Sequence, residues 1–475
     1  MNSNIIVIVI DSLRQDKCFG KSKKSAIPNL DQFIKHGTFF TQAISSAPIT
    51  VPSLSSIFTG LYPFESTVQD NDLFNLNPNL DTFVDDLVKS GYHTYAVIPE
   101  SMNHTNIPKL FMNVEFFNSF ATLYDENLGN KIIHMIKNNT MKSPWFLFIH
   151  LQDLHGNAVF HLGNSPKEFE DDNSGINQYE KMLSALDPWL GKILECLNST
   201  RTISVITSDH GSVSADFTNE MFNFVVENSK LKTIDPGLAF KSTNKIVRKF
   251  PKQLNPFRKK LSKIYTENKN NKIKKRMKPQ IEQIKNFDLT LYQKRLLKTT
   301  TLFTRDCFDE HFRPALIFSG PCIPSGKIIT TQSSLLDIFP TLLELAKIST
   351  QINHRGKSLV SKFNDVSSTE SVVMIDSTSS KSESNHSDTI GIRTEKLKYF
   401  RDRFDEGKNT HLYDLENDPM EEYNIYDKNP EIIKTMEYEL KKINSNRDFS
   451  FQQTNEINDL NAKKAKDLLR ELGYV

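Results

Sequence analysis

Three residues of types that commonly bind metal ions follow two apolar segments of the chain. Asp11 comes directly after Asn4–Ile10, and Asp209 and His210 come shortly after Thr202–Thr207. Both segments are rich in β-branched residues, which is typical of the buried strands of a parallel sheet. Ligands of such sheets gather beyond the carboxyl ends of the strands, where carboxylate and imidazole groups can converge on a divalent cation. The alternative is that Asp11 and Asp209 cap the helices that follow them.

A threonine at the start of a predicted helix is the candidate nucleophile. The segment Thr50–Gly60 contains Pro52, and proline fits the first turn of a helix, so Thr50 lies just before the helix N-terminus. The free N–H groups and the dipole there favour negative charge, which would stabilise both a metal-bound alkoxide and an anionic substrate. The alternative is an ordinary capping threonine.

The elements that must position these residues alternate between strand and helix patterns, which indicates an α/β sheet. A third strand candidate, Trp145–His150, is followed by Asp153 and His155, and after the basic region the globular pattern resumes at Arg313–Phe318. The other elements that we expect are helices over Asn29–His36, Asn79–Ser90, Tyr179–Leu197, Leu335–Ala346, Pro430–Ile443 and Asn455–Leu472, short strands at Ile390–Arg393 and Lys398–Arg401, and a linker over Ser367–Asp388.

Composition limits the class of protein. The 475 residues are 38% hydrophobic and 24% charged, close to globular averages, which excludes a wholly disordered or collagen-like chain. The apolar run Ile5–Ile10 is far shorter than the ~20 residues of a membrane-spanning helix, and it lacks the features of a signal peptide. We therefore expect no transmembrane segment and a cytoplasmic protein, with peripheral membrane attachment left open. The four cysteines have no paired spacing, which argues against a disulfide framework or a zinc cluster.

The net charge of +2 conceals a strongly basic segment. Lys241–Thr300 contains 19 basic and 3 acidic residues, a charge of +16, so the rest of the chain carries −14. Three interpretations stay open for this segment. It is a solvated helical surface, or a platform that attracts a polyanionic glycan, a teichoic-type polymer or a lipid headgroup. Nucleic-acid binding ranks last, because the segment lacks interleaved aromatic residues.

Several motifs, in order along the chain, resemble those of the sulfatase family within the alkaline-phosphatase superfamily. The motifs are Ile8–Asp16, Pro28–Asp31, Ala47–Ser53 with Thr59–Pro63, Ser208–Gly211, Ser319–Pro324, Ser334–Leu343 and Leu412–Pro419. They cover most of the chain except the basic segment, so the joint match is specific although each fragment alone is weak.

The resemblance implies a fold and a domain organisation. The expected fold class is α/β, a large mixed-sheet sandwich with helices on both faces, together with a small C-terminal α+β subdomain. Residues 1–214 and 301–365 would form the catalytic domain, residues 215–300 a basic insertion, and residues 366–475 the C-terminal subdomain and helices.

The resemblance also implies a hydrolase of sulfate or phosphate esters with a metal-activated nucleophile. Matched position by position, Asp11, Asp209 and His210 are metal ligands, and Thr50 is both a ligand and the nucleophile. His155 matches the family histidine that contacts the anionic group or the leaving oxygen. The candidate substrate-binding residues are Asp153, His311 and Arg14.

Three positions depart from the family pattern. Thr50 stands where sulfatases have the cysteine or serine that is oxidised to formylglycine, and Leu54 stands where they have an arginine. Ser12 replaces a second acid after Asp11. Because threonine cannot give formylglycine, none is expected, and the superfamily's enzymes for phosphorus esters use threonine here. The ligand set suits one divalent ion, Mn²⁺ or Zn²⁺ rather better than Ca²⁺.

Three functions follow from these departures. The first is metal-dependent hydrolysis of a sulfate or phosphate ester through Thr50. The second is transfer of a phosphoglycerol or phosphoethanolamine group to a glycan. The third is a catalytically inactive, sulfatase-like binding module, which Leu54 and Ser12 motivate. The partner expected of an enzyme is an anionic ester, with a glycan or polyanionic polymer bound through Lys241–Thr300.

Overall fold

A computed structural model describes most of the 475 residues. The described residues are 3–70, 73–118, 122–123, 127–138, 140–156, 166–230, 278–279, 282–302, 306–364, 371–377 and 388–444.

The centre of the molecule is a mixed sheet of eight strands in the order β11-β2-β10-β9-β1-β8-β6-β7. Its middle strands, β9, β1 and β8, run parallel, whereas β10 is antiparallel to both of its neighbours. The strands are β1 (Asn4–Ile10), β2 (Thr38–Phe40), β6 (His93–Pro99), β7 (Asn113–Phe117), β8 (Trp145–Leu151), β9 (Thr202–Thr207), β10 (Leu316–Ser319) and β11 (Lys327–Ile329). The expected α/β mixed-sheet fold is therefore confirmed.

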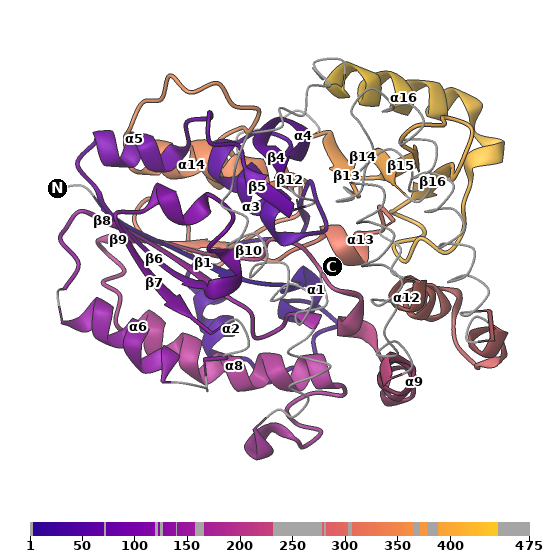
Figure 1. Cartoon of the computed structure of the whole chain (residues 1–475), viewed down its shortest axis with the longest axis horizontal. Helices are drawn as coiled ribbons and strands as arrows, with labels where there is room; N and C mark the ends of the chain where they lie inside the picture. The colour runs from indigo at the N-terminus through magenta and orange to yellow at the C-terminus, as the bar shows by residue number, and fades with distance from the viewer. Residues whose placement is uncertain are drawn as a thin grey trace, which may run out of the picture.

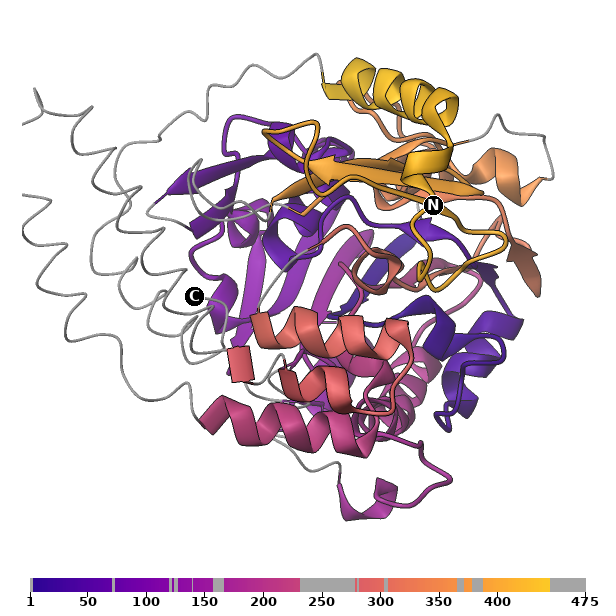
Figure 2. The same cartoon turned by 90° about the vertical axis from the view of Figure 1, so that its right-hand side faces the viewer.

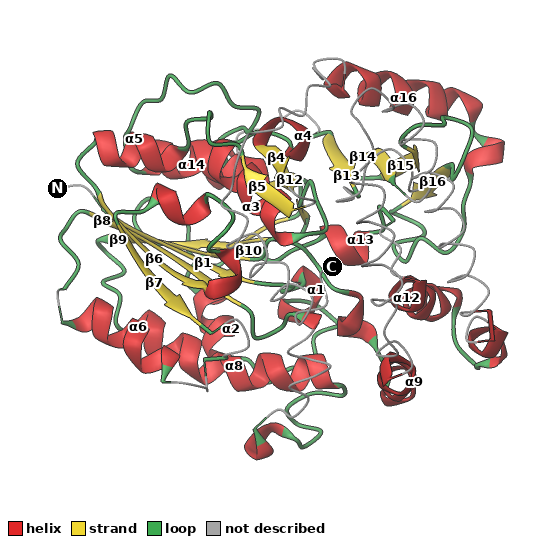
Figure 3. Ribbon diagram, viewed as in Figure 1, coloured by secondary structure: helices red, strands yellow, loops and turns green. Residues whose placement is uncertain are grey.

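Helices cover both faces of this sheet (Figures 1 and 3). One face packs against α3 (Thr50–Thr59), α5 (Phe83–Lys89) and α14 (Ile338–Leu345), and the other against α2 (Pro28–Lys35), α6 (Leu128–Lys137) and α8 (Gln178–Glu195). Alternate residues of a strand point to opposite faces, so a strand buried on both sides is apolar throughout. This is why β1 contains no polar residue after Asn4.

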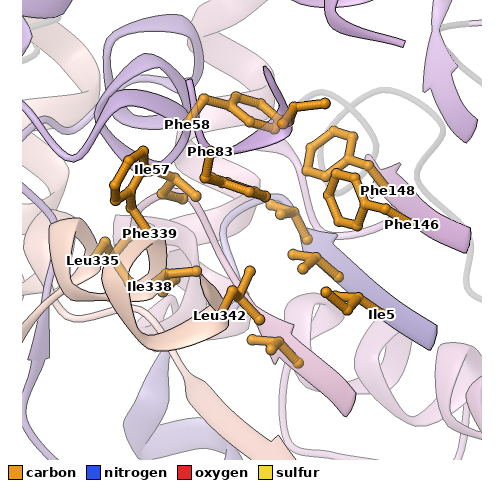
Figure 4. Close-up of a cluster of buried hydrophobic side chains, with 14 of the residues drawn as sticks. Ile5, Ile57, Phe58, Phe83, Phe146, Phe148, Leu335, Ile338, Phe339 and Leu342 are labelled. Carbon is orange, nitrogen blue, oxygen red and sulfur yellow. The ribbon is translucent and has the colours of Figure 1, made fainter. Parts of the chain in front are cut away.

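The core on the α3 face is rich in aromatic side chains (Figure 4). Phe58 of α3 and Phe83 of α5 pack on Phe146 and Phe148 of β8, with the ring centroids of Phe58 and Phe148 5.1 Å apart. Full burial of each such side chain contributes about 1.5–3 kcal/mol to the stability of the folded protein. This packing holds the N-terminal end of α3 above the carboxyl ends of the central strands.

The C-terminal sheet is a small antiparallel meander in the order β13-β14-β15-β16. Its strands are β13 (Val373–Asp376), β14 (Thr389–Arg393), β15 (Leu397–Asp402) and β16 (His411–Asp414). The amphipathic helix α16 (Pro430–Asn444) buries Met436 and Leu440 against this sheet. The small C-terminal α+β subdomain is thus present, to one side of the central sheet (Figure 1).

Helices before and within the basic segment lie beside the main body. Helices α9 (Asn219–Lys230) and α12 (Leu291–Leu302) share an apolar cluster and lie side by side (Figure 2). Most of Lys241–Thr300 lies outside the described residues. The division of the chain at residues 214, 300 and 365 stays a prediction.

Two expected elements differ in the structure. The helix expected over Asn79–Ser90 begins only at Phe83, because Thr82 and Asp85 form a capping box that starts the helix there. The linker expected over Ser367–Asp388 contains β13, whose residues pair with β14. The terminal helix expected over Asn455–Leu472 lies outside the described residues.

The remaining elements are short. They are α1 (Gln15–Cys18), β3 (Ala43–Ile44), α4 (Pro63–Ser66), β4 (Thr67–Asp70), β5 (Leu73–Leu76), α13 (Asp309–Phe312), β12 (Ser333–Ser334), α15 (Val360–Phe363) and the 3₁₀ turns η1 (Glu100–Met102), η2 (Ile107–Leu110), η3 (Lys167–Phe169), η4 (Val213–Asp216), η6 (Leu335–Asp337) and η7 (Tyr426–Lys428). Within the described part of the chain, every helix is too short or too polar to cross a lipid bilayer.

Candidate active site and metal centre

The central sheet brings Asp11 and Asp209 together. Val9 pairs with Thr207, so continuing the parallel register by two residues sets the two aspartates abreast beyond β1 and β9. Ligand atoms of Asp11, Asp209 and His210 lie within 4.8 Å of one another. Nε2 of His210 is 3.4 Å from Oδ2 of Asp209 and 3.8 Å from Oδ1 of Asp11. We call these three residues the carboxylate–histidine triad.

Two tight turns hold the triad in place. Ser12 has a φ of +66°, in the left-handed region, and turns the chain away directly after Asp11. Its hydroxyl donates to Oδ1 of Asp11 at 2.7 Å. Gly211 donates its N–H to the carbonyl of His311, and a Cβ at this glycine would lie 2.3 Å from the carbonyl oxygen of Glu310. Only glycine fits that approach.

Thr50 is the first residue of α3, and Ile49 occupies the capping position. The capping alternative for Thr50 is therefore wrong. Oγ1 of Thr50 lies 3.4 Å from Oδ2 of Asp11, so the helix N-terminus presents this hydroxyl to the triad. One turn along, Ser53 donates its hydroxyl to the carbonyl of Asp209 at 2.6 Å, whereas Leu54 is fully buried in the apolar core.

The helix-capping alternatives for the two aspartates are also wrong. Helix α1 begins at Gln15 with Arg14 at its N-cap, and the 3₁₀ turn η4 is capped by Ser212. Neither Asp11 nor Asp209 satisfies a helix end. Their carboxylates face each other instead.

Burial shapes the electrostatics of the triad. Burial, and then the charge of Asp209, raise the pKa of Asp11 to about 6. Burial also disfavours the charged form of Asp209, but His210 and His150 outweigh it and lower the pKa of Asp209 below its usual range. Two carboxylates are thus buried close together, and keeping both of them charged costs free energy.

The triad fits a divalent metal ion. Oδ2 of Asp209 is buried without a hydrogen-bond partner among the described residues, in a position that a cation would satisfy. Two carboxylates, an imidazole and a hydroxyl are donors that Mn²⁺ and Zn²⁺ accept. Asp11, Asp209, His210 and Thr50 are the residues that would hold such an ion.

Arg14 is committed to other partners. Its guanidinium forms ion pairs with Asp16 at 2.8 Å and Asp216 at 2.7 Å, and it donates to the hydroxyl of Tyr292. Burial opposes its charge, but the two aspartates raise the pKa of Arg14 well above its usual range. The structure therefore places this predicted substrate-binding residue in a structural network.

Of the other predicted site residues, Asp153 and His311 make structural contacts, whereas His155 lies near the triad. Oδ1 of Asp153 accepts a hydrogen bond from the N–H of Leu123, which is a structural role. His311 lies on α13, with its carbonyl bonded to Gly211. His155 lies close enough to the triad for the charge of His210 to act on it. Burial, and then that charge, lower the pKa of His155 to about 4. A neutral His155 can donate a hydrogen bond to an anionic group.

Sequence reasoning missed His150 as a site residue. It lies within β8, is fully buried, and its Nε2 is 3.9 Å from Oδ2 of Asp11. The signal was the alternation in β8, whose even-numbered residues Phe146 and Phe148 face α3. His150 continues that series, so its imidazole points to the same face as Asp11.

Two family profiles match consecutive parts of the chain. The sulfatase profile matches residues 3–245, and the profile of the N-sulphoglucosamine sulphohydrolase C-terminal region matches residues 301–446. The first covers slightly more than half of the chain and contains all residues of the triad.

Characterised relatives and solved structures agree with these matches. The chain is 22% identical to arylsulfatase K of Mus musculus, over 93% of this chain and 79% of that protein. A 100-residue stretch is 32% identical to an arylsulfatase of Clostridium perfringens, covering 20% of each chain.

The fold is similar to that of a protein solved with its substrate D-glucosamine-2-N,6-O-disulfate (TM-score 0.62, 16% identity, 96% of this chain and 100% of the other). It is also similar to the phosphonate monoester hydrolase of Agrobacterium radiobacter (TM-score 0.60, 15% identity, 93% and 95%). With the sulfatase profile spanning the loops of the triad and Thr50, this chain belongs to the sulfatase family of ester hydrolases.

Proposed function

We propose that this protein is a metal-dependent hydrolase that cleaves a sulfate ester of a glycan with the Thr50 hydroxyl as its nucleophile. The observation that carries the proposal is the position of Thr50, whose Oγ1 lies 3.4 Å from Oδ2 of Asp11 at the N-terminus of α3. One divalent ion, Mn²⁺, Zn²⁺ or Ca²⁺, would be held by Asp11, Asp209, His210 and Thr50. When bound, it supplies positive charge that favours the alkoxide and polarises the ester.

The residues of the chain support a double displacement. The Thr50 hydroxyl gives up its proton towards Asp11, and its oxygen forms a bond to the sulfur while the bond to the ester oxygen breaks. The leaving oxygen keeps the electron pair and takes a proton from solvent, which releases the alcohol. Water then cleaves the sulfo-threonine and releases sulfate. Neutral His155 donates a hydrogen bond to an oxygen of the transferred group.

The choice of a glycan sulfate rests on the relatives. The C-terminal part matches a profile named after an N-sulphoglucosamine sulphohydrolase, and a similar fold was solved with a disulfated glucosamine. A phosphate or phosphonate ester is the second candidate substrate. The observation in its favour is that the reacting group is an unmodified threonine hydroxyl, a nucleophile suited to phosphorus esters.

The other expectations about the setting of this enzyme remain proposals. A cytoplasmic location, and attraction of a polyanionic substrate by Lys241–Thr300, both rest on the sequence alone. The transferase and binding-module functions are outcomes that the experiment below separates from hydrolysis.

The test is an activity screen of the purified protein with Mn²⁺, Zn²⁺ or Ca²⁺ against sulfate monoesters, phosphate monoesters, phosphodiesters and phosphonates. We expect Thr50→Ala to lower activity by at least about 10³-fold, because it removes the nucleophile. Intact-protein mass spectrometry of a rapidly quenched reaction should find one sulfuryl or phosphoryl group on Thr50.

Ser56→Ala is the matched control. Ser56 lies in the same helix and donates its hydroxyl to the carbonyl of Pro52, away from the triad. It should keep activity within a few-fold of the unaltered protein. Full activity in Thr50→Ala would overturn the proposal. Turnover that requires an added glycan acceptor would identify a transferase, and a protein that neither binds metal nor turns over any ester would be a binding module.

A further inference from the structure

Helix α12 contacts the candidate site from outside the matched family profiles. The sulfatase profile ends at residue 245 and the second profile begins at residue 301, so most of α12 lies in a part of the chain that neither profile covers. The helix nevertheless packs against η4, the turn that follows the loop of His210. Its residues Tyr292, Leu296 and Leu297 are buried in the apolar cluster shared with α9.

The hydroxyl of Tyr292 is placed between two charged side chains. It donates to Oδ2 of Asp216 at 2.6 Å and accepts from Nη1 of Arg14 at 3.3 Å. Tyr292 and Arg14 are both buried. A phenylalanine ring would fill the same apolar space, so packing alone does not account for the hydroxyl. Burying a hydroxyl is costly unless it is hydrogen-bonded, as this one is at both of its neighbours.

Arg14 connects the two loops that carry the triad. It lies three residues after Asp11, and its Nη1 donates to the carbonyl oxygen of Ser212 at 3.2 Å, two residues after His210. The same nitrogen is 2.7 Å from Oδ2 of Asp216. With the tyrosine hydroxyl it has three acceptors for its two hydrogens, so its direction depends on how each acceptor is held. The tyrosine, which also donates to that carboxylate, therefore helps to fix one loop against the other.

A second residue of α12 is bonded to the opposite side of the same loop. Arg295 donates Nε and Nη2 to the two carboxylate oxygens of Glu310, at 3.1 and 3.0 Å. The carbonyl oxygen of Glu310 is the atom that a Cβ at Gly211 would meet. Tyr292 and Arg295 are three residues apart, so they lie on the same face of the helix. The two-point pair with Glu310 thus fixes the face of α12 that presents the tyrosine to the site.

We propose that Tyr292 is a positioning residue of the carboxylate–histidine triad and that it acts through Arg14 and Asp216. This inference rests on the proposed function in one respect, that the triad binds a divalent ion. Residues that orient metal ligands without touching the metal typically change metal affinity by about 10–100-fold when they are replaced. A hydroxyl with only a structural role would change the stability of the protein and leave the metal affinity of the folded protein unaltered.

The first test is the metal affinity of Tyr292→Phe in the full-length protein. Protein stripped with a chelator is titrated with Zn²⁺ or Mn²⁺ in the presence of a competing indicator, under conditions in which circular dichroism shows both proteins folded. We expect the dissociation constant of the ion to rise about ten-fold, which corresponds to about 1.4 kcal/mol. The reason is that phenylalanine keeps the packing but bonds neither Arg14 nor Asp216.

Hydrogen exchange of the metal-free protein is the second readout. In Tyr292→Phe we expect amide exchange at least about ten-fold faster over residues 11–17 and 208–216, and unchanged exchange in the sheet β13-β14-β15-β16. This measurement requires no bound ion, so it separates the inference from the proposed function. If the unaltered protein binds no divalent ion but the exchange rises as expected, the proposed metal dependence fails and the positioning role stands.

Two variants of the same helix are the matched controls. Thr300→Val removes a hydroxyl that donates to the carbonyl of Leu296 within the helix. Leu296→Ala shortens a fully buried side chain of the apolar cluster and removes no hydrogen bond of the side chain. We expect Leu296→Ala to lower the urea concentration at the midpoint of unfolding, and both variants to keep the dissociation constant of the metal within about two-fold.

Asp216→Asn tests the route by which Tyr292 acts. If the tyrosine acts through this carboxylate, changing both residues should weaken metal binding by less than the product of the two single effects. The inference would be overturned by an unchanged metal affinity in a Tyr292→Phe protein that binds metal, or by unchanged exchange over residues 208–216. Equal weakening of metal binding in Leu296→Ala would also overturn it, because loss of helix packing would then explain the effect.

Discussion

Asp11 and Asp309 are both buried aspartates next to the same site, but their neighbours carry opposite charges. Asp309 accepts hydrogen bonds from the guanidinium of Arg393 at 3.0 Å and from Nζ of Lys398 at 2.5 Å. Although burial opposes its charge, these cations hold the pKa of Asp309 well below its usual range. Asp11 faces another carboxylate, and burial with that charge raises its pKa to about 6.

The difference separates two clusters. Asp309 with Arg393 and Lys398 forms a structural cluster, which we call the complete cluster. The triad around Asp11 lacks such cations, and we call it the incomplete cluster. A buried acid with two or more cations around it is complete, and removing one partner leaves the others uncompensated. A buried acid that faces a second acid is incomplete until a cation arrives. Burial alone does not distinguish the two, because both side chains are buried.

The complete cluster anchors the incomplete one. Asp309 begins α13, and the residues that follow it accept backbone hydrogen bonds from three site loops. Gly211 donates to His311, Ser45 to Phe312 and Gln15 to Arg313. The C-terminal sheet, which contributes Arg393 and Lys398, therefore positions the triad through α13, although it contributes no residue to the triad.

Breaking the complete cluster should have the largest effect. Asp309→Ala leaves Arg393 and Lys398 buried with too little negative charge, and we expect a loss of about 3–5 kcal/mol in the free energy of unfolding. Urea denaturation followed by circular dichroism measures it. Glu416→Ala, which breaks the exposed pair with Lys396, is the control and should change stability by less than about 1 kcal/mol. Equal losses in the two variants would show that Asp309 does not hold the domain together.

The pH dependence of stability tests a second acid of the same cluster. Burial, opposed by Lys398 and reinforced by Asp309, raises the pKa of Glu421 to about 7. Between its ordinary pKa of about 4.3 and this value, the folded protein binds more protons than the unfolded chain, so the contribution of Glu421 falls as pH rises. Above pH 7 the contribution is lost.

Glu421→Gln imitates the protonated form and removes this dependence. Relative to the unaltered protein, the variant should gain up to about 3 kcal/mol of stability as pH rises from 5 to 8. Denaturant unfolding across that pH range measures the difference between the two proteins. A difference that is constant with pH, or that falls as pH rises, would contradict the assignment.

Removing the charge of Asp11 from the incomplete cluster should have the smallest effect on the free energy of unfolding, and that effect should be a gain. Asp11→Asn removes the repulsion between two buried carboxylates, and we expect metal-free protein to gain about 1–2 kcal/mol at pH 8. The same change should abolish the rise in melting temperature that Zn²⁺ or Mn²⁺ causes in the unaltered protein. Thermal melts with and without a chelator measure both quantities. A metal-free variant that is less stable than the parent would show that Asp11 is structural, as Asp309 is.

Much of the fold and part of the site could be predicted from local patterns. The strands β1 and β9 were predicted at their observed bounds, because apolar, β-branched runs record burial on both faces. Asp11, Asp209 and His210 were found because they follow those strands. His150 was missed because it lies in an otherwise apolar strand and carries no motif of its own.

The roles of Arg14 and Asp309 could not be predicted in the same way. Arg14 lies within a recognisable motif, but its partner Asp216 is about two hundred residues away, so only the folded chain shows that its charge is already used. The predicted start of the helix Asn79–Ser90 was wrong for a local reason, because the capping box at Thr82 begins the helix at Phe83.

The sequence by itself determined which residues can do chemistry and on which strands and helices they lie, because apolar periodicity and turn residues act over a few positions. Only the tertiary structure decided the charge around each of them. Asp11 and Asp309 are the same residue type, and their chemistry differs because one meets Asp209 and the other meets Arg393 and Lys398. Those neighbours come from distant parts of the chain, and electrostatic interactions inside a protein depend on distance in space rather than along the sequence.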